Sequence, residues 1–184
     1  MEIVHIALDN YDDIFSDFDI GPYETRLISA DFLSELKRKT KNREVGKIIL
    51  TLPGKIREKA KEQLIIKRLK EFFRRKEHEK EKKFKESLIF GLLLITVAVL
   101  LIIFLSVTKL FFDTIFYDYL IFPSWYISWK GLDKFFHSMK ILKEKDYFRK
   151  LQKATIHFDD EEKYLAAQES KDLTEQEKSH VAMH

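Results

Sequence analysis

LIFGLLLITVAVLLIIFLSV occupies residues 88–107, and none of its twenty side chains is ionisable. At about 1.5 Å of rise per residue, twenty helical residues cover the roughly 30 Å hydrocarbon core of a bilayer. A buried helix in a soluble core is the alternative, but such helices are usually shorter and keep a polar stripe. The stretch lies too far from Met1 to be a cleaved signal peptide. It therefore predicts a transmembrane helix, which we place at residues 87–109.

Charge is distributed unevenly around this stretch. Residues 36–86 carry twenty bases and eight acids, and residues 130–153 carry eight bases and three acids. Residues 1–35 and 154–184 are net acidic. Basic segments beside a span are typical of the cytoplasmic side. We therefore expect a multi-pass protein of the cytoplasmic membrane with both termini in the cytoplasm.

A second apolar stretch, TIFYDYLIFPSWYISW, covers residues 114–129 and contains Asp118 and Pro123. It is either a short, kinked second span over residues 114–130 or a re-entrant or interfacial segment. The basic residues after it favour the span, because a hairpin returns the chain to the cytoplasmic side. Four aromatic residues are expected at the membrane interface, where such rings prefer to lie: Tyr117, Tyr119, Trp125 and Trp129.

The remaining segments predict a small α+β fold. Residues 2–8, 47–52 and 154–159 have the composition of strands, and because a lone strand is unstable they are expected to form one sheet. Helices are expected at residues 31–41, from about residue 55 into the first span, and at residues 133–152. The fold class is thus a three-stranded cytoplasmic sheet with helices, interrupted by a transmembrane helical hairpin.

This interpretation divides the chain into six segments. They are a strand–helix–strand segment (1–54), an amphipathic and then charged helix (55–86), the first span (87–109), the second span or interfacial segment (114–130), an amphipathic helix and strand (131–160), and a disordered acidic tail (161–184).

The acidic run DNYDDIFSDFD at residues 9–19 is the densest polar feature. Its carboxylates could bind a hard cation, but the spacing does not match an EF-hand loop, and an acidic, turn-capping loop explains it more simply. We expect no metal site there. A loop with more carboxylates than a short connection needs is instead a candidate partner-binding element. The predicted contacts are Asp12, Asp13, Asp17, Asp19, Tyr23 and Arg26.

Basic residues flank the predicted spans. Because they adjoin the membrane, contact with anionic lipid headgroups explains them better than binding of nucleic acid, which is not expected. The predicted headgroup contacts are Arg74, Arg75, Lys82, Lys83, Lys85, Lys130 and Lys134.

Little in the sequence points to catalysis. The chain has no cysteine, 5 Gly and 3 Pro, so disulfides, cysteine-ligated metals and glycine-rich phosphate loops are excluded. His5 and His157 fall on predicted strands that could be neighbours, but a metal site would need a further ligand. We expect no cofactor and no enzymatic activity.

Residues 14–36, IFSDFDIGPYETRLISADFLSEL, and residues 125–136, WYISWKGLDKFF, carry a resemblance. They resemble a family of small uncharacterised prokaryotic two-span membrane proteins with an N-terminal FSDFD…PY…SxDFL motif. The resemblance covers about residues 2–160. It implies a two-span hairpin with cytoplasmic ends, and no activity. Ser124 stands where that family usually has a glycine.

The functional expectation is a non-enzymatic, membrane-anchored interaction or scaffold protein that engages a protein partner or a second copy at the cytoplasmic face. Two alternatives remain open. One is an oligomeric transport or channel component in which Asp118 handles an ion or proton. The other is a metal-dependent membrane enzyme that uses the carboxylates of residues 9–19.

Overall fold

The computed structural model describes residues 2–41, 44–108, 114–162, 164 and 166, and leaves out the side chains of residues 108, 114–118 and 120. The chain divides into two compact units. Unit 1 contains residues 1–73 and 150–184, and unit 2 contains residues 74–149. The predicted acidic tail at residues 161–184 lies almost entirely outside the described residues.

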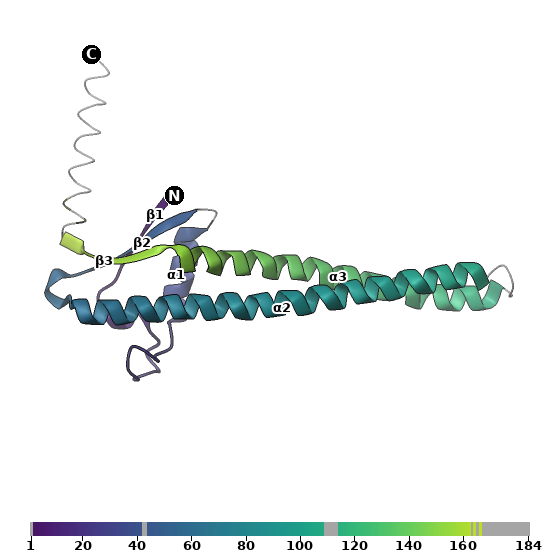
Figure 1. Ribbon diagram of the computed structural model, residues 1–184, viewed down its shortest axis with the longest axis horizontal. Coiled ribbons are helices and arrows are strands. Elements are labelled where there is room, and N and C mark those ends of the chain that lie inside the picture. Colours follow the sequence, from purple (N-terminus) through teal and green to yellow (C-terminus); the bar gives the residue numbers. More distant parts are fainter. Residues whose placement is uncertain (1, 42–43, 109–113, 163, 165, 167–184) are drawn as a thin grey trace, which may run out of the picture. The chain divides into compact units, whose positions relative to one another are not determined.

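The centre of unit 1 is a three-stranded parallel sheet in the order β1-β2-β3 (Figure 1). The strands are β1 (Glu2–Ala7), β2 (Val45–Leu52) and β3 (Thr155–Asp160). Buried side chains alternate with more exposed ones along β1 and β3, whereas the last five residues of the central strand β2 are all buried. Val4 and Ile6 of β1, Leu50 of β2 and Ile156 of β3 are buried. The predicted sheet and all three strands are confirmed.

Helix α1 (Ala30–Thr40) connects β1 to β2, and its ends follow from local chemistry. Ser29 caps the helix by accepting hydrogen bonds from the backbone N–H groups of Asp31 and Phe32 at 3.2 and 3.5 Å. Phe32 and Leu36 lie one turn apart and are buried, so they supply the helix's share of the core.

Helix α2 (Lys59–Thr108) is a single helix of 50 residues that includes the long apolar stretch. It begins four residues later than the expected Lys55, because Pro53 precedes a short 3-10 turn, η2 (Gly54–Ile56). Within unit 1, its Ile65, Leu69 and Phe73 are buried and complete the core.

Helix α3 (Thr114–Lys153) carries both the second apolar stretch and the predicted amphipathic helix. The sequence predicted a boundary between residues 130 and 131, where the composition changes from aromatic to basic. Pro123 lies inside this helix, and Gly131 does not end it. The second stretch and the amphipathic segment are therefore parts of one helix of 40 residues.

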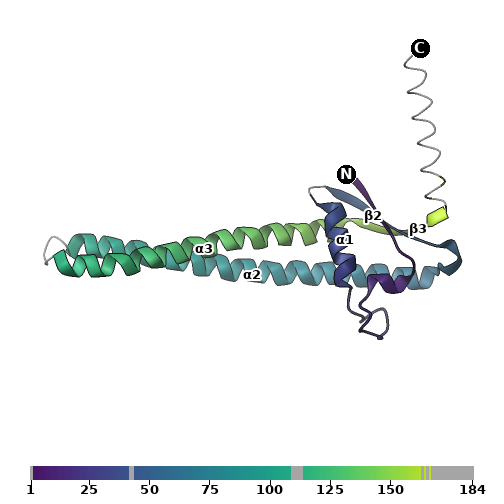
Figure 2. The same ribbon diagram turned by 180° about the vertical axis from the view of Figure 1, so that it is seen from behind.

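In unit 2, α2 and α3 lie antiparallel and side by side (Figures 1 and 2). The buried positions of each helix recur every seven residues, which is the repeat of a coiled-coil seam. The seam residues of α2 are Gly91, Ala98 and Leu105, and those of α3 are Ser124, Gly131 and Ser138. Nearly all are small, so the two backbones can approach closely.

The two backbones lie close together where Gly91 meets Gly131. A Cβ atom added to Gly131 would lie 2.8 Å from Cγ1 of Ile95, 3.0 Å from its backbone nitrogen and 3.1 Å from the carbonyl oxygen of Gly91. Two of these obstacles are backbone atoms. Glycine is therefore required here by packing and not by an unusual backbone conformation.

Candidate interaction site

The connection between β1 and α1 forms a closed loop in unit 1. Phe15 and Ile28 pair in an antiparallel bridge at its neck. Two backbone hydrogen bonds flank the bridge, from Ser16 N to the Leu27 carbonyl and from Ser29 N to the Ile14 carbonyl, each 2.9 Å long. Residues 16–27, which we call the acidic loop, thus have the joined ends of an Ω-loop.

Asp13 precedes the neck and caps the backbone N–H groups at the start of a short helix. It accepts hydrogen bonds from the backbone N–H groups of Asp9 at 2.7 Å and Asn10 at 2.9 Å. Asn10 in turn caps the 3-10 helix η1 (Tyr11–Ile14). This reciprocal arrangement is a capping box, so Asp13 stabilises the chain locally.

Asp19 holds the acidic loop together from inside. Its carboxylate accepts hydrogen bonds from Leu27 N at 2.8 Å and Gly21 N at 3.1 Å, and so links its two sides. The Leu27 hydrogen bond, followed by that from Gly21, lowers the pKa of Asp19 below its usual 3.8. Both bonds favour the ionised form.

This pKa sets a pH dependence. Because the folded pKa of Asp19 is lowered, the stabilisation of the loop by its carboxylate is fully present above pH 3.8 and is lost as the pH falls through the folded value.

We expect Asp19→Ala to increase tryptic cleavage after Arg26 at neutral pH, measured by mass spectrometry of the digested protein. The exposed Asp17→Ala is the matched control. Equal cleavage rates in the two variants would contradict the assigned role.

Arg26 joins the neck and the interior of the loop. Its guanidinium donates hydrogen bonds to the Asp12 carboxylate and to the Asp19 carbonyl, and it lies over the Phe15 ring at 5.4 Å. The Tyr23 hydroxyl also contacts Asp12, at 3.4 Å. Asp12, Tyr23 and Arg26 therefore form one intramolecular cluster.

Arg68 of α2 anchors the loop to the rest of unit 1. Its side chain is largely buried, since the residue is only 8 % exposed. The guanidinium donates to the carbonyl of Thr25 at 2.9 Å and to that of Arg26 at 3.0 and 3.1 Å. Arg68 thus satisfies the carbonyls at the end of the loop's last turn.

The loop tip, residues 17–20, projects two large apolar side chains into solvent. Phe18 is 100 % exposed and Ile20 is 96 % exposed. Isolated exposed apolar residues are common, but here a tightly hydrogen-bonded loop presents two of them together. Such a preorganised tip can dock without a large loss of loop entropy.

The predicted contact residues are thus brought together, mostly in a supporting role. Asp12, Asp13, Asp19, Tyr23 and Arg26 all make hydrogen bonds within unit 1, whereas Asp17 is exposed at the tip. Sequence reasoning missed Phe18, Ile20 and Arg68. The signal for the first two was their apolar nature within an acidic run. Arg68 gave no signal, because its partners lie more than 40 residues away.

Among the residues that the structure describes, no three His, Asp or Glu side chains are grouped so that they could hold a metal ion. His5 and His157 are both in register with Ile49, so β2 separates them. Adjacent strands are about 4.8 Å apart, which puts the two histidines roughly 10 Å from each other. The idea that their strands are neighbours is therefore wrong.

The predicted headgroup residues lie on unit 2, where they are exposed. Several are paired along their own helix. Lys83 lies 2.8 Å from Glu79 and Lys85 lies 2.9 Å from Glu81. Lys83 and Lys76 lower the pKa of Glu79 to about 2. Lys82 lies 3.9 Å from Glu86, and Lys130 lies over the Tyr126 ring at 5.6 Å. The remaining predicted headgroup residues are Arg74, Arg75 and Lys134.

The predicted interface aromatics are also exposed where their side chains are described. Tyr119, Trp125 and Trp129 are exposed on α3, and the two indoles stack at 6.2 Å. The side chains of Tyr117 and Asp118 lie outside the described residues. The proposed role of Asp118 therefore remains a prediction.

Fold and site together define an α+β protein in which a long helical hairpin is inserted between the second and third strands of a parallel sheet. Comparison with protein-family models, curated proteins and solved structures gave no match. The resemblance to two-span membrane proteins therefore remains a prediction.

Proposed function

We propose that this chain is a membrane-anchored interaction protein. The hairpin of unit 2 holds it in the bilayer, and the acidic loop of unit 1 engages a protein partner at the cytoplasmic face. The observation that carries the proposal lies in α2. Its most apolar 18-residue window has a mean hydropathy of 3.3, yet only 17 % of that window is buried. A helix in a soluble core would be mostly buried, so this surface requires an apolar environment.

Chain topology supports a second crossing. β3 pairs in parallel with β2 over six residues, so both strands belong to one sheet and lie on one side of any membrane. If residues 88–107 cross the bilayer after β2, the chain must cross back before Thr155. In the described part of the chain, α3 is the helix that covers this interval.

Contacts within unit 2 support α3 as the returning segment. Gly131 meets Gly91, and Ser87 Oγ donates to the Lys134 carbonyl at 3.2 Å. Because the helices run antiparallel, the aromatic part of α3 before Gly131 lies alongside the apolar part of α2. An interfacial segment would not accompany a span in this way. This favours the second span over the re-entrant alternative.

Ion pairs between the two helices support a position for the end of the proposed membrane segment. Three ion pairs join the helices in the part of the hairpin that lies before Gly91 in α2 and after Gly131 in α3. They are Lys80 with Glu144, Lys145 with Glu81 at 3.8 Å, and Arg149 with Glu77 at 3.3 Å. Charged groups of this density belong in water or among headgroups. The anionic leaflet would thus meet the bases near Lys85, Lys130 and Lys134.

The interaction role is carried by the acidic loop. Its tip combines full exposure of Phe18 with a framework of hydrogen bonds that fixes the loop from Asp19 to Leu27. Apolar, aromatic side chains held on rigid backbone are the usual anchors of protein interfaces. A loop with no binding role would not need both features.

A photo-crosslinking amino acid at position 18 tests the interaction role in living cells. We expect illumination to give discrete protein adducts of the full-length chain, because the tip is seated on a partner. The same amino acid at the exposed Lys55 of unit 1 is the control and should give none. Adducts that are absent at position 18, or equal at both positions, would contradict the proposal.

A further inference from the structure

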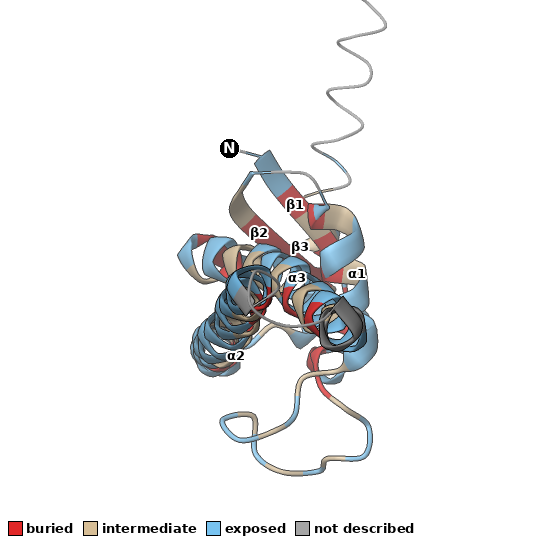
Figure 3. Ribbon diagram, turned by 90° about the vertical axis from the view of Figure 1, so that its right-hand side faces the viewer, coloured by how far each residue is buried: buried red, intermediate tan, exposed pale blue. Residues whose placement is uncertain are grey.

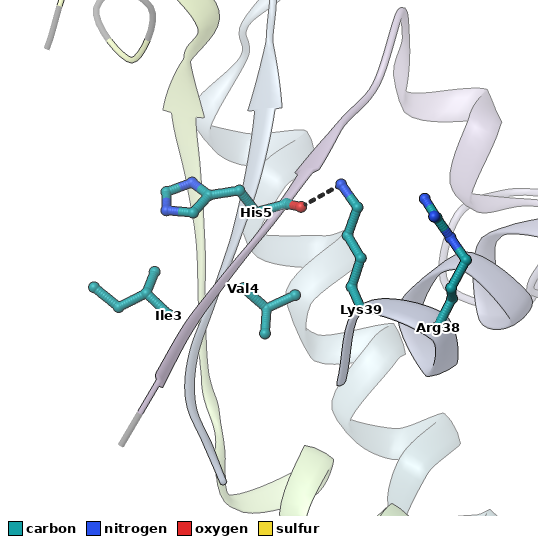
Figure 4. A pocket seen from close by; sticks show the side chains of 5 residues that line it. All are labelled: Ile3, Val4, His5, Arg38 and Lys39. Carbon is teal, nitrogen blue, oxygen red and sulfur yellow. Dashed lines mark hydrogen bonds between the residues drawn. The ribbon is translucent and has the colours of Figure 1, made fainter. Parts of the chain in front are cut away.

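Unit 1 also carries a pocket of about 390 Å³ between β1 and the end of α1, which we call the β1–α1 pocket (Figure 4). It is lined by Ile3, Val4, His5, Arg38 and Lys39. β1 is an edge strand, and Ile3 remains more than half exposed. Ile3 lies on the opposite side of β1 from Lys39 and Arg38 (Figure 4). An exposed apolar side chain and two cationic ones therefore flank the free edge of this strand.

We infer that this pocket receives the loop tip of a second copy of the chain. The inference rests on the proposed function and names the partner as the protein itself. Apolar Phe18 and Ile20 would contact the β1 side of the pocket. The acidic residues around them would meet the bases at the end of α1.

Charge complementarity supports this pairing. Residues 9–27 contain six acids and the single base Arg26. Residues 35–41 contain four bases and the single acid Glu35, which pairs with Arg38 at 2.7 Å and with Lys39 at 3.6 Å. After that pairing the end of α1 is still net positive. Complementary potentials of this kind select partner and register.

The geometry requires two copies. In side and end views, the acidic loop and β1 lie on opposite sides of unit 1 (Figures 1 and 3). The tip of one chain therefore cannot reach its own pocket. Each copy offers one tip and one pocket, so two copies can exchange tips in a closed dimer, or the contact can continue from copy to copy as a row or a ring.

Side-chain docking explains the contact better than strand addition. Lys39 Nζ donates to the His5 carbonyl at 2.7 Å, and so occupies an acceptor at the edge of β1. A lysine at an edge strand opposes pairing with another strand. The contact surface is consequently small, and such interfaces are weak in solution. Confinement of all copies to one membrane raises their effective concentration and compensates for this.

The absence of cysteine permits a direct test with the full-length chain in its membrane. Phe18→Cys and Ile3→Cys are placed on the same chain, and mild oxidation is followed by non-reducing electrophoresis. We expect a ladder that begins with the covalent dimer and extends to trimers and larger species where the contact continues from copy to copy. The control chain combines Ile3→Cys with Lys55→Cys and should give at least about tenfold less product, since no docking brings these two positions together.

A charge exchange tests specificity in the same assay. Asp17→Lys alone and Arg38→Glu alone should each reduce the ladder several-fold, and the two together should restore it. A ladder no stronger than the control overturns the inference. If position 18 still gives photo-adducts of a mass other than a dimer, the interaction role stands and only the identity of the partner is wrong. If photo-adducts are also missing, both proposals fall.

Discussion

Replacing Gly131 by leucine is expected to separate the two helices of unit 2. Even a single Cβ atom at this position would lie 3.0 Å from the backbone nitrogen of Ile95 and 3.1 Å from the Gly91 carbonyl oxygen. Overpacking a filled site costs about 1–3 kcal/mol, and we expect at least the upper value because backbone atoms cannot move aside as side chains can. Gly131→Ala should show a smaller effect of the same sign.

The separation can be followed between Lys80 and Glu144, whose side chains pair across the hairpin. With cysteines at both positions, a short bifunctional maleimide should bridge the helices in the parent chain and much less in Gly131→Leu. Helical content by circular dichroism should stay constant, since leucine favours a helix more than glycine does. Thr96→Leu, on an exposed face of α2, is the control that adds similar bulk. Unchanged bridging in Gly131→Leu would refute the close packing of the two glycines.

Replacing Arg68 by alanine is expected to release the acidic loop. The substitution removes a buried guanidinium that donates to the carbonyls of Thr25 and Arg26. Hydrogen bonds from charged groups contribute about 1.5–3 kcal/mol each, so losing the bonds to these two carbonyls should cost about 3–6 kcal/mol. The same change leaves two carbonyls without this donor. The folded loop should therefore open far more often.

Hydrogen exchange at the Leu27 amide reports this opening, because that amide is bonded to Asp19 only while the loop is closed. Arg68→Ala should strongly accelerate exchange of the Leu27 amide. In Arg68→Lys the exchange rate should lie between those of Arg68→Ala and the parent chain, since lysine keeps the charge but cannot reproduce the planar guanidinium fork. Lys67→Ala, at the exposed neighbouring position, is the control. Slow exchange in Arg68→Ala would mean that the loop is held without this anchor.

The sheet and the helices could be predicted from composition because each depends on local pattern. The β-branched run at residues 47–52 and the Ser29 cap before α1 carry their own signals. The end of the second stretch could not be predicted in the same way. The change of composition at residues 130 and 131 predicted a boundary, but Gly131 lies within α3 and leaves room for the backbone of α2. That requirement exists only once the two helices are packed.

The acidic run shows the same limit in the candidate site. The sequence indicates a loop with many carboxylates, and it places them near one another correctly. It does not say that Asp19 bonds inward to Leu27 N while Phe18 points outward. That division depends on the bridge between Phe15 and Ile28, a long-range contact. The polar residues with the strongest local signal therefore became the framework, and the apolar residues between them became the exposed tip.

The proposed membrane hairpin is tested most directly by its topology. Because the chain has no cysteine, single cysteines at Thr114, where α3 begins, and at Glu162, just after β3, can be labelled in intact cells with a membrane-impermeant maleimide. We predict labelling at position 114 and none at position 162 until the cells are opened. Labelling at position 162 in intact cells would place β3 outside while β1 and β2 remain inside. That result would contradict the hairpin, and with it the shared sheet and the proposed interaction face.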